Sequence, residues 1–196
     1  MSENVHSAPV QEIVEIVKTV VYALLIALVL RVLLFQPFTI PSASMEPNLL
    51  EGDYIIVSKY AYGYSRHSIP FSPPLFEGRI AARAPSRGDI IVFKLPRDGR
   101  TDYIKRLIGL PGDRIQMRDG LLYINDEPVE IQPDGTFSEP MERQGPEGSL
   151  PHCSNAPVGI GGTCEKQRAV ETLPGGESHT ILDIGRQSLD KTGVFN

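Results

Sequence analysis

The chain has 196 residues, a formal net charge of −5 and 41% hydrophobic residues. This length and apolar content are sufficient for a folded core, which argues against wholesale disorder. The negative net charge argues against a general nucleic-acid binder, because such proteins present a basic face to phosphates.

The first predicted element is a long apolar helix that runs from Ile13 to Phe35. At about 1.5 Å per residue it reaches roughly 34 Å, enough to cross a hydrocarbon core of about 30 Å. Its charged residues, Glu15, Lys18 and Arg31, lie towards its ends, where long side chains can reach the headgroups. The apolar residues cover all sides, which favours lipid. A buried soluble helix stays open as the alternative, because the uncharged centre, 19–30, is short.

The stretch IPSASMEPNLL follows this helix and contains the small-x-small triplet Ser42-Ala43-Ser44. Such a triplet is typical of the cut site of a secretory signal peptide. A cleaved signal peptide has a shorter apolar run behind a basic start, whereas this start is acidic. We therefore expect a retained signal-anchor, with a short tail at 1–12, a transmembrane helix at 13–35 and a soluble domain at 36–196. Charge leaves its orientation open, because no Lys or Arg precedes the helix.

The rest of the chain predicts short strands and turns. Alternating or apolar runs predict strands at 54–60, 89–95 and 102–110, and a hairpin whose arms, RIQM and LLYIN, flank Arg118-Asp119-Gly120. Gly-Asp pairs at 52–53, 88–89 and 112–113 mark turns in which glycine supplies a positive φ and aspartate caps the turn. Two polar stretches rich in turn-forming residues, 65–86 and 133–178, predict long exposed loops. The soluble part is therefore predicted to be one mainly-β domain.

The two cysteines, Cys153 and Cys164, lie in a Gly/Pro-rich stretch and allow three interpretations. A disulfide requires an oxidising compartment. A zinc site would recruit His152 and His179, but the spacing fits no tight ligand pattern. Two unrelated thiols are the third possibility. The disulfide is favoured if this part of the chain lies outside the cytoplasm.

A serine nucleophile needs an activating base, which could be a histidine or a lysine. His67, His152 and His179 lie in loop-like stretches and no Gly-x-Ser-x-Gly motif is present, so we expect surface histidines rather than a Ser-His-Asp triad. Lys105 lies in the apolar strand YIKRLIGL, where burial would lower its pKa towards the range of a general base. From spacing alone, Lys105 can equally face solvent on an edge strand.

Four stretches occur in order behind the helix: IPSASMEPNLLEGD, DYIIVSKYAYG, RGDIIVFK and DYIKRLIGLPGDRI. Together they resemble bacterial type I signal peptidase (leader peptidase), over roughly residues 13–131. The resemblance implies a coiled β-sheet catalytic domain behind one transmembrane helix. It also implies a single-pass enzyme of the bacterial inner membrane, whose domain lies on the periplasmic side and cuts signal peptides after Ala-x-Ala sites.

The same resemblance implies roles for individual residues. Ser44 would be the nucleophile, Lys105 the general base and Ser42 an oxyanion donor. The residues expected to contact substrate are Phe38, Ile40, Pro41, Met45, Leu49, Asp102, Tyr103 and Ile104. Arg106, Cys153 and Cys164 would be structural. The expected partners are the signal peptides of preproteins and membrane lipid, with no cofactor, metal or nucleic acid.

The family's last motif, Gly-Asp-Asn-Arg with a following Ser and Asp-Ser-Arg, is not found before Asn196. We therefore expect a domain that is C-terminally incomplete, in which Arg106 lacks its acidic partner and Lys105 its orienting hydroxyl, unless another segment substitutes. A silent protein that only binds signal-like segments is the competing hypothesis. A self-cleaving Ser/Lys repressor is disfavoured, because those proteins carry a DNA-binding motif where this chain has an apolar helix.

Overall fold

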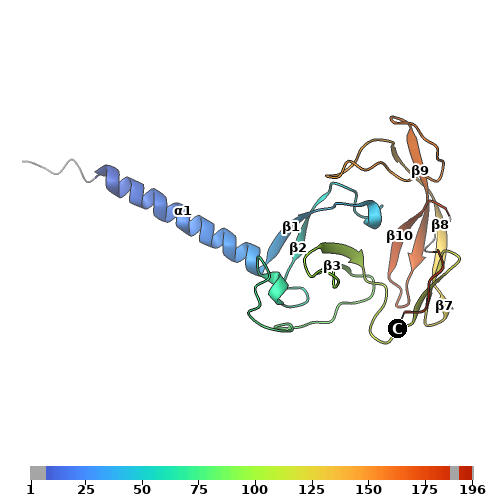
Figure 1. The fold of residues 1–196 in the computed structure, drawn as a ribbon, viewed down its shortest axis with the longest axis horizontal. Coiled ribbons are helices and arrows are strands. Elements are labelled where there is room, and N and C mark those ends of the chain that lie inside the picture. The colour runs from blue at the N-terminus through green and yellow to red at the C-terminus, as the bar shows by residue number, and fades with distance from the viewer. Residues whose placement is uncertain (1–7, 186–189, 196) are drawn as a thin grey trace, which may run out of the picture. The chain divides into compact units, whose positions relative to one another are not determined.

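A computed structural model describes residues 8–185 and 190–195 of the chain, which Figure 1 traces as a ribbon. Its contacts divide the chain into two compact units. The first consists of Met1–Pro37 and Ile56–Arg83, and the second of Phe38–Ile55 and Ala84–Asn196. Most of the tail expected at 1–12 lies outside the described residues. The candidate catalytic residues all belong to the second unit.

The expected apolar helix is present as α1, but its bounds are Ala8–Leu33 rather than 13–35. It begins earlier because Pro9 suits the first turn of a helix, where a missing N–H costs nothing. It ends earlier because Phe35 already belongs to strand β1, and Pro37 disfavours helical backbone in the residue before it.

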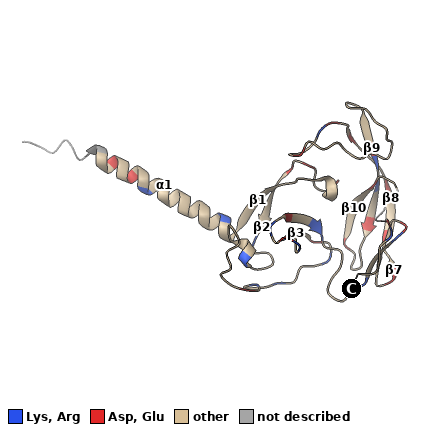
Figure 2. Ribbon diagram, viewed as in Figure 1, with Lys and Arg blue, Asp and Glu red and all other residues tan. Residues whose placement is uncertain are grey.

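Charge is confined to the two ends of α1, as Figure 2 shows. Near its start, Lys18 and Glu15 form an ion pair of 2.9 Å, and Arg31 lies in the last turn. The span Val10–Leu33 has a mean hydropathy of 2.4 and its most apolar part is not buried against the rest of the protein. By length and composition, α1 is therefore able to cross a membrane.

Two short strands follow α1 and pair as a two-stranded sheet: β1 (Phe35–Thr39) and β2 (Tyr54–Ser58). Beyond β2, the stretch at 65–86 is a loop, as predicted, with one short 3-10 turn, η2 (Arg66–Ser68). Tyr64 ties this loop to the end of α1, because its hydroxyl donates to the carbonyl of Leu33 at 2.7 Å.

The strands predicted in the middle of the chain are confirmed. β3 (Ile90–Lys94) pairs with β4 (Asp102–Arg106) in an antiparallel two-stranded sheet. β5 (Ile115–Arg118), β6 (Leu121–Ile124) and β7 (Glu127–Pro128) form a second antiparallel sheet. The predicted hairpin turn joins β5 to β6. Its two central residues, Asp119 and Gly120, have φ of 52° and 82°, the conformation that favours tight hairpins.

The three Gly-Asp pairs form three copies of one turn. Gly52, Gly88 and Gly112 have φ of 94°, 89° and 93°, as expected. In each copy the aspartate carboxylate accepts the backbone N–H of the residue three positions earlier, at 2.8 Å for Asp53, 2.8 Å for Asp89 and 2.6 Å for Asp113. Each turn therefore satisfies a backbone donor with its own side chain.

The prediction of a long loop at 133–178 is confirmed for its middle part, 141–162, but is wrong on either side of it. This region contains β8 (Glu130–Pro140), β9 (Thr163–Thr172) and the start of β10 (Ser178–Asp183), which form an antiparallel sheet in the order β10–β9–β8. The prediction failed because the inward-facing positions of β9 include charged residues. Lys166 and Glu171 are only 3% and 7% exposed, so the strand lacks the apolar alternation by which strands are recognised.

The hydrophobic core of the second unit is small. Leu122, Ile124, Val129 and Leu173 form a buried cluster against which Ile108, Ile115 and Met117 pack. The cluster draws on the β5–β6–β7 sheet and on the end of β9, so it joins two of the small sheets. The expected fold class, mainly β behind one N-terminal apolar helix, is confirmed.

Candidate active site

The candidate nucleophile lies on a short turn between β1 and β2. Residues Ala43–Met45 form the 3-10 turn η1, which closes when the N–H of Glu46 donates to the carbonyl of Ala43 at 3.0 Å. Met45 faces inward and is 5% exposed, whereas Ser44 is exposed. The turn therefore fixes the backbone through Met45 and presents the Ser44 hydroxyl on the surface.

Lys105 meets this serine from β4. The Lys105 Nζ and Ser44 Oγ form a hydrogen bond between residues 61 positions apart in the sequence. Lys105 lies opposite Ile91 of β3, in the middle of the two-stranded sheet. The structure thus brings together the two side chains that the sequence suggests as base and nucleophile.

The surroundings of Lys105 favour its neutral form. Burial lowers the pKa of Lys105 below the ordinary value of 10.5. An amine whose pKa is lowered by burial can accept a proton from a serine hydroxyl near neutral pH, which is what a general base requires.

Ser42, the candidate oxyanion donor, also lies near the nucleophile. Its Oγ is 3.3 Å from the Ser44 Oγ. Ser42 is the N-cap residue of η1, with φ −151° and ψ 152°, but its side chain makes no capping hydrogen bond. A hydroxyl in this position is available to donate elsewhere, and the oxyanion role of Ser42 stays a prediction.

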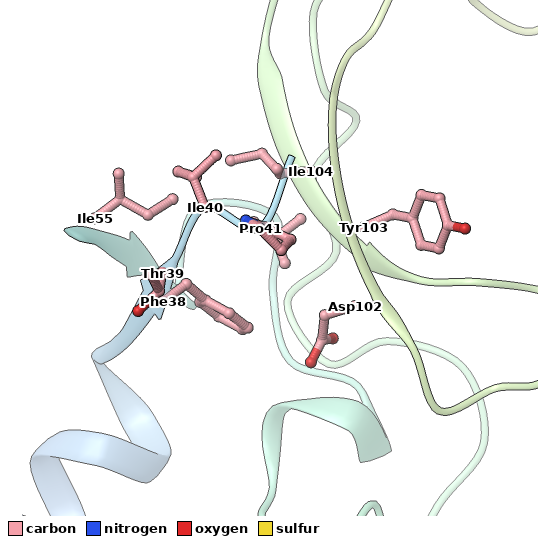
Figure 3. A pocket seen from close by; sticks show the side chains of 9 residues that line it. Phe38, Thr39, Ile40, Pro41, Ile55, Asp102, Tyr103 and Ile104 are labelled. Carbon is pink, nitrogen blue, oxygen red and sulfur yellow. The ribbon is translucent and has the colours of Figure 1, made fainter. Parts of the chain in front are cut away.

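A hollow of about 180 Å³ lies beside these residues, within the second unit. Its lining includes six of the residues expected to contact substrate: Phe38, Ile40, Pro41, Asp102, Tyr103 and Ile104. Figure 3 shows Ile40, Pro41 and Ile104 close together, with the Tyr103 ring turned away from them. A hollow of this size suits a small side chain rather than a drug-sized ligand, which needs roughly 300–1,000 Å³.

Two expected substrate residues are absent from the lining and three others were missed. Met45 is buried within its own turn, and the N–H of Leu49 bonds back to the Met45 carbonyl at 3.0 Å. The lining residues that sequence reasoning did not name are Thr39, Ile55 and Val92. Val92 could have been found from pairing, because it lies opposite Ile104 in the β3–β4 register.

The free edge of β4 completes the geometry. β4 pairs with β3 on one side, and within residues 8–185 and 190–195 no strand covers its other side. An uncovered edge presents backbone donors and acceptors that an extended peptide can pair with.

The amino-acid sequence matches a known protein family and several named proteins. A sequence profile of the family described as "Signal peptidase, peptidase S26" matches residues 13–190. The chain belongs to this family. It is similar to proteins named Signal peptidase I from Rickettsia massiliae (strain Mtu5), at 53% identity over 119 residues, and Rickettsia typhi (strain ATCC VR-144 / Wilmington), at 52% over 118 residues. The matched regions cover 60% and 59% of this chain but only 45% of each relative, so the match spans about half of their length.

Membership of the signal peptidase family makes the surroundings of Arg106 informative. Burial lowers the pKa of the Arg106 guanidinium, and Glu171 of β9 lies close enough to oppose this shift, so Arg106 has the acidic neighbour that we expected it to lack. The guanidinium also donates to the Gly88 carbonyl at 2.7 Å. The acidic neighbour was missed because β9 itself was not predicted.

Glu171 in turn contacts His179, whose Nε2 lies 3.2 Å from a carboxylate oxygen. The expectation of a surface histidine is wrong here, because the His179 side chain is only 8% exposed. Burial, together with Arg106, lowers the pKa of His179, which favours the neutral imidazole beside this carboxylate. This S26 family member therefore has a buried polar cluster behind the strand that carries Lys105.

The two cysteines are joined in the structure. Cys153 and Cys164 form a disulfide, with Cα atoms 5.2 Å apart. Cys164 belongs to β9 and is fully buried. Of the three interpretations left open by the sequence, the structure has the disulfide.

Proposed function

We propose that this chain is a membrane-anchored serine endopeptidase that removes N-terminal signal peptides from secreted preproteins. Its membership of the S26 signal peptidase family supports this reaction class. The observation that carries it is the hydrogen bond between Lys105 and Ser44, together with the lowered pKa of the lysine.

The reaction follows from this pair. Neutral Lys105 accepts the Ser44 proton while the serine oxygen attacks the scissile carbonyl and forms a C–O bond. The resulting oxyanion is stabilised by the Ser44 backbone N–H and the Ser42 hydroxyl, each such donor being worth about 3–4 kcal/mol. Protonated Lys105 then gives its proton to the leaving amine as the C–N bond breaks. A water, deprotonated by the same lysine, hydrolyses the acyl-enzyme and regenerates Ser44.

The substrate is a signal peptide with small residues before the cut, of the Ala-x-Ala type. The hollow lined by Ile40, Pro41 and Ile104 has room for a small side chain, which supports this preference. The peptide binds extended along the free edge of β4. We assign the protein to the bacterial inner membrane, crossed once by α1, with the catalytic domain in the periplasm, where an oxidising environment would maintain the disulfide.

The test is cleavage of a preprotein by the full chain in lipid vesicles. We expect a product cut after the Ala-x-Ala site, identified by mass spectrometry, and we expect Ser44→Ala and Lys105→Ala each to abolish it. Lys105→Arg also fails, because a guanidinium stays charged and cannot act as a base. The double variant is no worse than either single one, because the two groups act as a unit. Cleavage that survives Lys105→Ala contradicts the mechanism, and binding without cleavage by the unaltered chain identifies a silent binder.

A further inference from the structure

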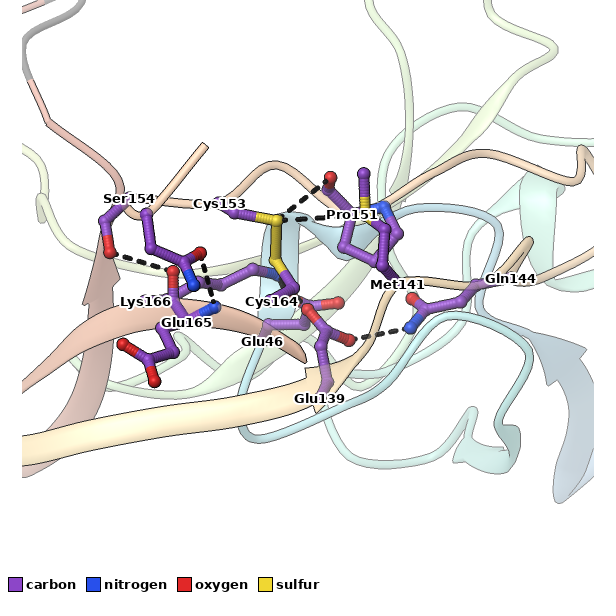
Figure 4. Close-up of polar contacts among 11 residues, drawn as sticks. Glu46, Glu139, Met141, Gln144, Pro151, Cys153, Ser154, Cys164, Glu165 and Lys166 are labelled. Atoms are coloured by element: carbon purple, nitrogen blue, oxygen red, sulfur yellow. Dashed lines mark hydrogen bonds and ion pairs between the residues drawn. A yellow bond between two sulfur atoms is a disulfide. The ribbon is translucent and has the colours of Figure 1, made fainter. Parts of the chain in front are cut away.

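A second group of charged residues lies in the unit that carries the active site, and it is buried. Lys166 of β9 forms ion pairs with Glu46 and with Glu139 of β8, the latter at 2.6 Å. The three side chains are only 4%, 5% and 8% exposed. Gln144 donates to the second oxygen of Glu139 at 2.7 Å, as Figure 4 shows. We call Glu46, Glu139 and Lys166 the buried ion cluster.

The buried ion cluster reaches the nucleophile through Glu46. Glu46 follows Met45 directly and caps the turn η1, so its carboxylate is two residues from Ser44. A second polar link lies nearby, because the Asn48 side-chain amide donates to the Thr180 carbonyl of β10 at 3.1 Å. The turn that presents Ser44 is therefore attached by side chains to two strands of the β8–β9–β10 sheet.

Burying such a cluster costs free energy, so stability alone does not explain why these charged residues lie there. Taking ions out of water costs several kcal/mol per ion, and apolar replacements are often as stable. Burial lowers the pKa of Lys166, but its hydrogen bonds to Glu139 and Glu46 raise it more, so the ammonium stays charged. Burial raises the pKa of Glu46 despite its contact with Lys166. A charged lysine held between two buried carboxylates fixes the position of both.

The backbone bonds of the turn are local. The backbone N–H groups of Asn48 and Leu49 both donate to the Met45 carbonyl at 3.0 Å, and Glu46 bonds to Ala43. These bonds set the shape of the turn but not its distance from β4, where Lys105 lies. The Glu46–Lys166 contact, like the Asn48–Thr180 bond, joins the turn to a distant strand, and it is the one of the two that involves ionic side chains.

We propose that Lys166 is a positioning residue, which holds Glu46 and thereby sets the Ser44 hydroxyl against Lys105. This inference rests on the proposed function. The β8–β9–β10 sheet then acts as a support for the nucleophile as well as a structural element. Removing the link displaces Ser44 from Lys105 without altering the peptide-binding hollow.

The kinetic test compares Lys166→Met and Glu46→Met with a matched control, Arg168→Met. Arg168 is two residues further along β9 and pairs with Asp134 of β8 at 3.0 Å, so the control also removes a cation between the same strands. For preprotein cleavage we expect kcat to fall about 10- to 100-fold in both test variants, because small misplacements of catalytic groups cost this much. KM changes little, and the control keeps its kcat. The double variant Glu46→Met/Lys166→Met is no slower than Lys166→Met alone.

A second measurement needs no protease activity and so separates this inference from the proposed function. In Ser44→Cys the introduced thiol is the one free thiol, because the chain's two cysteines are joined. A neighbouring ammonium lowers a thiol pKa below about 8.5, so the pH profile of alkylation by iodoacetamide reports the contact with Lys105.

We expect Lys166→Met or Glu46→Met, added to Ser44→Cys, to move this profile back towards about 8.5, while Arg168→Met leaves it in place. Circular dichroism checks that each variant is folded, and Glu46→Met, which leaves Lys166 paired with Glu139, decides the matter if Lys166→Met does not fold. Unchanged alkylation profiles in the folded variants would overturn the positioning role, whether or not the unaltered chain cleaves preproteins.

Discussion

The hydrogen bond between Lys105 and Ser44 joins two side chains that are 61 residues apart. Its two partners have different origins. Ser44 is exposed because Met45 anchors the turn beside it, and Lys105 is half-buried because β4 lies against β3. The chemistry of the site therefore depends on one residue being accessible and the other being desolvated.

The rate of cleavage is expected to depend on the protonation of Lys105, and therefore on pH. Burial lowers the pKa of Lys105, and only the neutral amine is a base. Cleavage must therefore rise with pH through the lowered pKa and reach its plateau below pH 10.5, the ordinary lysine value. The measurement is kcat/KM for a preprotein substrate across roughly pH 6–10. A rate that keeps increasing up to the ordinary lysine value, or that does not vary, is incompatible with a desolvated base.

Sequence reasoning reached the Ser44–Lys105 pair but not the Glu46–Lys166 pair, and the reason is physical. Ser44 and Lys105 each lie in a stretch with a recognisable local pattern. Glu46 is a single acidic residue two positions after Ser44, and Lys166 is one of several charged residues in a polar stretch. Nothing local to either residue indicates that they meet, because the contact arises from how β9 packs.

Among the single elements, the Gly-Asp turns allow the contribution of one side-chain hydrogen bond to stability to be measured. Asp53→Ala removes the acceptor for the Leu50 N–H, now bonded at 2.8 Å. We expect the free energy of unfolding to fall by about 1–2 kcal/mol, as for a lost hydrogen bond to a charged group. Asp53→Asn is the matched control, because it keeps a side-chain oxygen and should lose less. The measurement is denaturant unfolding, and equal losses in the two variants would rule out the hydrogen bond as the cause.

The disulfide joins β9 to the loop before it. The double change Cys153→Ser/Cys164→Ser removes the constraint on a short loop. We expect it to lower the free energy of unfolding by about 2–3 kcal/mol. For a protein of this size that corresponds to a Tm lower by roughly 4–12 °C. Protein isolated from membranes without reductant should resist alkylation at both cysteines. Two alkylated thiols in its mass spectrum would mean that the bridge does not form.

The elements themselves were predicted unevenly. β3 to β6 were found because their apolar residues recur with strand spacing or flank a turn sequence. β8 to β10 were missed because Lys166 and Glu171 occupy inward positions where apolar residues are expected. A buried charge can only be recognised once its partners are known, and those partners come from distant parts of the chain.

At the scale of the whole molecule, the prediction is topological. α1 contributes an apolar span, Val10–Leu33, which at about 1.5 Å per residue is roughly 36 Å long. Protease added to intact spheroplasts should digest the chain after residue 40, if the catalytic domain lies outside the cytoplasm. Lysed spheroplasts provide the control for protease access. Complete protection of that part in intact spheroplasts would indicate the reverse orientation.

A helix that anchors a protein in a bilayer also changes which concentration determines how often the protein meets its substrate. If the proposed function holds, a preprotein whose signal peptide enters the same bilayer meets this protein by lateral diffusion within a surface, so the relevant concentration is molecules per area of lipid. Adding empty vesicles or detergent to an assay dilutes both partners on that surface, even when their amounts per volume are fixed. Rates for the α1-anchored protein should therefore be compared at a constant ratio of protein to lipid.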